Sequence, residues 1–145
     1  MSEENKALVR REIEEVFNAQ GDLDVADEIF APEYVSHDAL GPEDARGPEG
    51  AKETARMFRD AFPDVQLSIE DQVAEGDKVV TRWIGSGIHQ GELMRIAPTG
   101  NQVRVNGITI SRIEDGKIAE EWENYDALSM MQQLGAIPSL EEAQA

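Results

Sequence analysis

The hydrophobic residues of this chain change from one spacing to another near residue 63, and this change limits the folds that it can adopt. Before that point they recur every three or four residues, which is typical of amphipathic helices. After it they alternate with polar residues in short runs separated by turns, which is typical of strands. We predict helices at residues 4–18, from Asp22 to about 31, and 48–61, and strands at 33–37, 65–74, 78–89, 103–113 and 118–125.

Two short connections between the later strands have the composition of tight turns. They are Glu75-Gly76-Asp77 and Glu114-Asp115-Gly116, and they predict antiparallel neighbours. Helices that precede a run of antiparallel strands favour an α+β fold, in which the N-terminal helices pack on one face of a strongly bent, mostly antiparallel sheet. Such a sheet forms a cone that can hold a small molecule. A chain of 145 residues fits a single domain, residues 1–145.

Charge is the unusual part of the composition. Thirty acidic residues against thirteen basic ones give a formal net charge of −17. Nucleic acid is therefore not an expected partner, because binding phosphates requires a basic surface. The acids are spread along the chain, which indicates a solvated acidic surface, and this pattern fits either a halophilic source or an ordinary acidic protein.

The chain also lacks cysteine, a long apolar run and the apolar core of a signal peptide. The chain has no cysteine, which excludes disulfides, thiolate metal sites and a cysteine nucleophile. No apolar run reaches the length of a membrane span, and the segment MSEENKALVRRE lacks the apolar core of a signal peptide. We expect a soluble, cytoplasmic protein without a membrane partner.

The segment DGKIAEEWENYDALSMMQQLGA, residues 115–136, passes from strand spacing to helical spacing at Asp126. Ile118, Trp122 and Asp126 share one parity, and we expect this face to line the pocket. Glu121 and Glu123 lie on the other parity, which we expect to face solvent. Asp126 then has two possible roles that do not exclude each other, namely N-cap of the following helix and general base.

Six residues, Trp122 among them, are further candidates for a pocket. His37 and His89 are the only histidines, and their wide separation does not indicate a metal site. Trp83 and Trp122 are candidate wall residues or core residues. Asn106 shares the parity of neighbouring isoleucines, where an amide needs a partner or a ligand. Tyr34, in the same segment as His37, is a further candidate substrate-binding residue.

Three stretches of the chain resemble the SnoaL-like polyketide cyclase (ester cyclase) family of the NTF2-like superfamily. They are VRREIEEVFNAQGDLDVADEIFAPEYVSHD, GPEGAKETARMFRDAFPDVQLSIEDQVAEGDKVVTRW and NGITISRIEDGKIAEEWENYDALSMMQQLGA. The resemblance implies an NTF2-like cone, a homodimer formed through the open sheet face, and ring closure by intramolecular aldol condensation without metal or cofactor. It also implies that Asp126 is the base.

The resemblance has one clear departure. Some family enzymes also use a histidine on the preceding strand, and residues 103–113 contain none. Asn106, His37 or His89 could take its place. The function predicted is therefore acid/base cyclisation of a small hydrophobic, polyketide-like substrate by a lyase or isomerase. The alternatives are an isomerase or hydrolase that uses the same aspartate, a non-catalytic small-molecule-binding protein, and an assembly module.

Overall fold

The computed structural model describes residues 2–38, 44–138, 141 and 144. Helical segments come first and last along the chain: α1 (Ser2–Arg11), the π-helical segment η1 (Glu12–Phe17), the 3-10 turn η2 (Leu23–Val25), α2 (Ala26–Ile29), α3 (Gly47–Ala61) and α4 (Ala127–Gln133). The strands are β1 (Phe30–Asp38), β2 (Ala45–Arg46), β3 (Gln66–Glu75), β4 (Lys78–Ile88), β5 (Gln102–Glu114) and β6 (Lys117–Tyr125).

The strands form one curled sheet that does not close on itself. Their order is β2-β1-β6-β5-β4-β3, so the four later strands follow one another as an antiparallel meander. The α+β prediction and the bent sheet are confirmed. The pairing of β1 with β6 is parallel, and it brings the N-terminal part of the chain beside the last strand.

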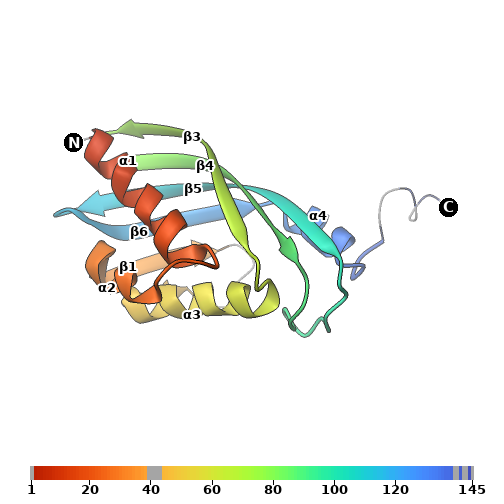
Figure 1. Ribbon diagram of the computed structural model, residues 1–145. Helices are drawn as coiled ribbons and strands as arrows, with labels where there is room; N and C mark the ends of the chain where they lie inside the picture. Colours follow the sequence, from red (N-terminus) through yellow and green to blue (C-terminus); the bar gives the residue numbers. More distant parts are fainter. Residues whose placement is uncertain (1, 39–43, 139–140, 142–143, 145) are drawn as a thin grey trace.

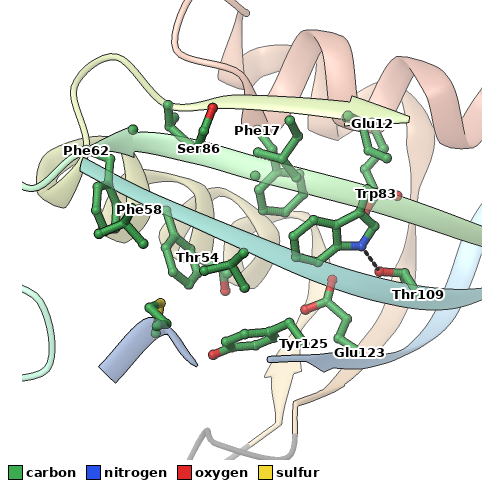
Figure 2. Close-up of a pocket in the computed structure, with 18 of the residues that line it drawn as sticks. Glu12, Phe17, Thr54, Phe58, Phe62, Trp83, Ser86, Thr109, Glu123 and Tyr125 are labelled. Carbon is green, nitrogen blue, oxygen red and sulfur yellow. Dashed lines mark hydrogen bonds between the residues drawn. The ribbon is translucent and has the colours of Figure 1, made fainter. Parts of the chain in front are cut away.

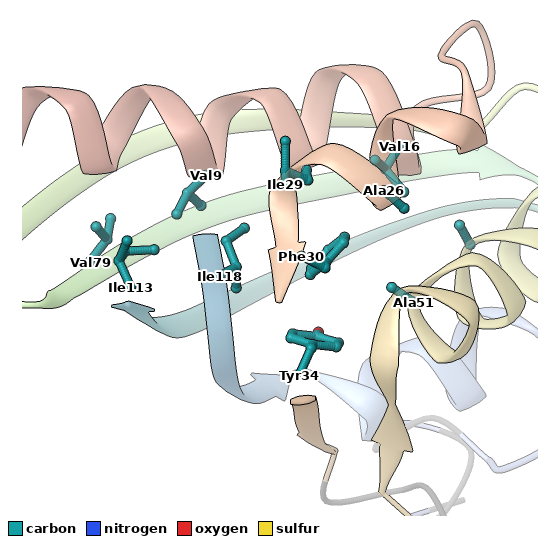
Figure 3. Packing of buried hydrophobic residues seen from close by; sticks show 11 residues of the cluster. Val9, Val16, Ala26, Ile29, Phe30, Tyr34, Ala51, Val79, Ile113 and Ile118 are labelled. Carbon is teal, nitrogen blue, oxygen red and sulfur yellow. The ribbon is translucent and has the colours of Figure 1, made fainter. Parts of the chain in front are cut away.

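The helices cover one side of the sheet and leave the other side open. α1 lies across the concave face, and α3 runs beside β1 (Figure 1). Burial of apolar side chains on this side produces two hydrophobic clusters. One joins α1, α2, α3 and β1 around Phe30 and Ile118 (Figure 3). The other joins the end of α3, β5 and α4 around Phe62 and Met130.

The predicted elements match the structure closely, with two exceptions. Residues 44–50, predicted as part of a loop, contain β2 and the start of α3, while residues 40–43 of that loop lie outside the described part of the chain. Pro32 was expected to end the second helix, but that helix ends at Ile29 and Pro32 lies in β1. Both predicted turns are present, with Gly76 and Gly116 at φ of +61° and +76°.

A single extra residue in β6 changes which side chains face the concave side. Ile113 pairs with Ile118, but Arg112 pairs with Glu120, so Ala119 is a β-bulge. Side chains on a regular strand alternate, and one inserted residue reverses the alternation beyond it. Ile118 faces inward as expected, but past the bulge it is the parity of Glu121 and Glu123 that faces inward.

Candidate functional site

A cavity of about 110 Å³ lies between the two hydrophobic clusters, on the concave side of the sheet (Figure 2). Most of the lining is apolar, and its aromatic side chains are Phe17, Phe58, Phe62, Trp83 and Tyr125. Its ionisable acids are Glu12, Asp38 and Glu123. Among the described residues, no lysine, arginine or histidine lines it.

A row of polar side chains crosses this cavity from strand to strand. Strand pairing places Thr81 opposite Thr109, Thr109 opposite Glu123, and Glu123 opposite Asp38. Directly paired residues on one face lie about 5 Å apart. The row therefore sets hydroxyl and carboxyl groups side by side on an otherwise apolar wall.

The indole of Trp83 forms one side of the site and is held in place by two contacts. Its Nε1 donates a hydrogen bond to Oγ1 of Thr109 at 3.0 Å. The ring lies against Gly107, where an added Cβ would come within 2.2 Å of Trp83 Cζ2. The Trp83 and Tyr125 rings are 6.5 Å apart between centroids. Gly107 thus allows the indole to lie flat on the strand beside the polar row.

Glu123 is the titratable group best placed for acid/base chemistry. Its carboxyl group points into the cavity (Figure 2). Burial, followed by the nearby charges of Glu121 and Asp38, raises the pKa of Glu123 to about 8. A carboxyl group with such a pKa is a far stronger base than one in water, and its pKa lies close to neutral pH.

Two further carboxyl groups lie next to Glu123. Glu12 is 3% exposed and enters from the first turn of η1, and Glu121 is fully buried. Burial raises the pKa of Glu12 well above its usual range, as do the charge of Glu121 and a hydrogen bond with it. Tyr34 Oη and Ser111 Oγ donate hydrogen bonds to the two oxygens of Glu121, at 2.8 and 2.5 Å.

The hydroxyl group of Tyr125 has no hydrogen-bond partner among the described residues, although its oxygen is buried. Burial raises the pKa of Tyr125, and the charges of Asp38 and Glu123 raise it further, so the group is a neutral O–H donor. A buried hydroxyl group without a partner is uncommon in folded proteins. It is available to a ligand carbonyl in the cavity.

The structure contradicts the predicted orientation of the β6 face. Trp83, a candidate wall or core residue, lines the cavity, but Trp122 and Asp126 lie on the other side of the sheet. Asp126 is exposed, and its Oδ1 accepts a hydrogen bond from Ser129 N at 3.0 Å, so it has the predicted N-cap role. The bulge at Ala119 is the physical reason that Trp122 and Asp126 face away from the cavity. The prediction assumed that every second residue after Ile118 faces the same side, and the bulge reverses this alternation.

The remaining predicted residues also lie outside the cavity lining. Asn106 is exposed on the open face of the sheet. His37 contacts Glu120 and Asp44 at 2.8 and 3.1 Å and stacks on Trp122.

The two other predicted residues are buried in the core. His89 is fully buried beside Phe62, and its Nδ1 accepts a hydrogen bond from Thr99 N. Tyr34 packs on Phe30 and bonds Glu121 behind the cavity wall.

Sequence reasoning missed Glu12, Glu123, Thr109 and Tyr125. One signal pointed toward them, because a glycine inside a strand often marks a close approach of another group. Gly107 and Thr109 lie on the same side of their strand, and Asn106 lies on the opposite side. The glycine therefore indicated that the side of Thr109, and not the side of Asn106, faces the concave side of the sheet.

Among the described residues, no group of three or more histidine, aspartate or glutamate side chains is arranged to hold a metal ion. In the same part of the chain, no helix combines the length and the apolar character needed to cross a bilayer.

Comparisons with known proteins agree with this architecture. The chain is 33% identical over 125 residues to the aklanonic acid methyl ester cyclase AcmA of Streptomyces galilaeus, covering 84% of this chain and 85% of AcmA. A candidate SnoaL-like polyketide cyclase from Jannaschia sp. CCS1 matches with a TM-score of 0.86 and 27% identity, covering 94% and 95% of the two chains.

A second solved structure, AclR, a candidate hydroxylase from Streptomyces galilaeus, matches with a TM-score of 0.84 and 26% identity, covering 99% of this chain and 88% of AclR. The family model of the SnoaL-like polyketide cyclases matches residues 7–134. Because this match spans nearly the whole chain, the protein belongs to the SnoaL-like polyketide cyclase family.

Proposed function

We propose that this protein closes a ring in a small hydrophobic, polyketide-like substrate by intramolecular aldol chemistry without a cofactor, and that Glu123 is its general base. The observation that carries the proposal is the Glu123 carboxyl group, which is desolvated and lies in the same aromatic cavity as Tyr125, whose hydroxyl group has no partner among the described residues. Asp126 is the base predicted from sequence, but it does not line this cavity.

The proposed reaction conserves every atom of the substrate. Glu123 takes a proton from a carbon between two carbonyl groups, while Tyr125 donates a hydrogen bond to the enolate oxygen. The enolate carbon then bonds to an aldehyde or ketone carbon of the same molecule. The oxygen of that second carbonyl takes the proton back from Glu123, so the carboxylate is regenerated and the product is an isomer of the substrate.

The charge of the lining favours an uncharged substrate. Among the described residues the lining holds three ionisable acids, Glu12, Asp38 and Glu123, and no basic side chain that could pair with an anionic substrate. A free carboxylate would be repelled there, whereas an ester would not. The name of AcmA describes an enzyme that cyclises a methyl ester, which is a substrate of this uncharged kind.

The test uses aklanonic acid methyl ester as the probe, with turnover followed by liquid chromatography and mass spectrometry. We expect a product of unchanged mass, and a loss of roughly 10²- to 10⁴-fold in kcat/KM for Glu123→Gln. Asp126→Asn is the matched control, because it changes a carboxylate near the end of the same strand but outside the cavity, and it should keep near wild-type turnover.

Other outcomes separate the competing functions. Loss of turnover in Asp126→Asn but not in Glu123→Gln would make Asp126 the base. A product heavier by one oxygen atom would indicate hydroxylation, the activity suggested by the name of AclR. Thermal stabilisation by the probe without any turnover would favour a binding protein.

We also propose that the open face of the sheet joins two copies of the chain. An apolar row crosses this face from Val80 through Ile110 to Trp122, and Ile108 beside it is 47% exposed. Sedimentation at micromolar concentration should show a dimer, and Ile108→Lys should weaken it because a charge would be buried there. A monomeric wild-type protein under these conditions would contradict the proposal.

A further inference from the structure

We propose that Glu12 and Glu121 act as a positioning pair that holds one fixed negative charge beside Glu123 and thereby sets the lower pH limit of the reaction. This inference rests on the proposed role of Glu123 as the base. Nothing in the reaction itself requires the pair, since neither member takes the substrate proton.

The two carboxyl groups share one charge. They are hydrogen-bonded to each other in a part of the core that excludes water. A hydrogen bond between two carboxyl groups requires a proton on one of them, and two adjacent buried carboxylates repel each other strongly. The pair therefore holds a single proton and a single negative charge.

The hydrogen-bond donors around the pair place that charge on Glu121. Its two oxygens accept hydrogen bonds from Tyr34 and Ser111. Hydrogen bonds to a carboxylate stabilise its charged form. In the described part of the chain Glu12 receives no such set of donors, and burial raises its pKa well above the usual range, so Glu12 carries the proton.

Glu121 is close enough to Glu123 for this charge to matter. The two side chains lie on the same face of β6, two residues apart, which is about 7 Å along a strand. Among the residues that the structure describes, the other charged group that faces Glu123 is Asp38 on β1. The remaining neighbours on the cavity side are uncharged: Thr54 on α3, Thr81 and Trp83 on β4, Thr109 and Ser111 on β5, and Tyr34 and Tyr125.

The local backbone supports a dedicated site for Glu12. It is the first residue of a six-residue π-helical segment that interrupts the helix begun by α1. Short π-helical segments often occur at functional sites, because they redirect a side chain at a cost in helix stability. Here the segment begins at the residue that turns a carboxyl group into the core.

The test measures the titration of Glu123 directly and needs no substrate. Glutamate side chains are labelled with ¹³C at the carboxyl carbon, and the Glu123 signal is assigned with Glu123→Gln. We expect Glu121→Gln to lower the titration midpoint of Glu123 by about one to two pH units, the effect of one charge at roughly 7 Å in a protein interior. The acidic limb of kcat/KM should move by the same amount.

Glu12→Gln is the matched comparison. It makes the same isosteric change in the same pair, but the new amide still donates to Glu121 and leaves its charge in place. The Glu123 midpoint should therefore move by less than about half a pH unit. Glu53→Gln, on the exposed side of α3, should leave the midpoint and turnover unchanged.

An unchanged midpoint in Glu121→Gln, or equal shifts in Glu121→Gln and Glu12→Gln, would overturn the inference. If Glu121→Gln does not fold, the double variant Glu12→Leu with Glu121→Met replaces the whole pair by apolar groups, which proteins often tolerate. The same lowering is expected there, and its absence is equally decisive. The proposed role of Glu123 as the general base is tested separately, by the turnover of Glu123→Gln, and does not depend on the titrations.

Discussion

At the scale of the residue, Glu123 couples folding to pH. Its pKa is about 8 in the folded chain and 4.5 as the ordinary value, so the folded state binds a proton that the unfolded state releases between these values. Its contribution to stability is complete below pH 4.5 and is lost as pH rises toward 8. The free energy of unfolding of wild type should fall relative to Glu123→Gln by up to about 1.4 kcal/mol per pH unit in this window. Urea denaturation at pH 5 and pH 8 measures the difference, and parallel pH dependences of the two proteins would contradict it.

At the scale of the element, α4 depends on its first residue and closes one end of the core. Asp126 caps it, Met130 and Leu134 bury its apolar side, and the Gln133 side chain bonds both backbone groups of Arg104. Asp126→Ala should therefore lower the free energy of unfolding by about 1 kcal/mol, whereas Asp126→Asn should keep most of the cap. Chemical denaturation of both variants measures this, and equal losses would mean that the cap geometry is not what stabilises α4.

At the scale of the whole molecule, the net charge of −17 opposes compaction. Raising KCl from about 0.1 to 1 M shortens the Debye length from roughly 10 to 3 Å and screens repulsion between surface carboxylates. The midpoint of thermal unfolding should rise over this range. Calorimetry in KCl measures it, and a flat response would show that the acids are already paired or too far apart to matter.

The sequence by itself determined the order and type of the elements. Helical spacing before residue 63, strand spacing after it and the turns at Gly76 and Gly116 predicted the helices and the meander, because local geometry and backbone conformation follow directly from residue spacing and turn chemistry. The same residues carried the family resemblance. For Trp83 the residue pattern left a wall position and a core position open, and the fold places it in the cavity lining.

Only the tertiary structure decided which carboxyl groups are buried. A one-residue bulge at Ala119 reverses the face of β6, and no pattern in the sequence marks it. The parallel pairing of β1 with β6 and the path of η1 then bring Asp38 and Glu12 to Glu123 from distant parts of the chain. The pKa of a carboxyl group depends on the water and charges around it in three dimensions, so its chemistry follows from the fold rather than from its neighbours in the sequence.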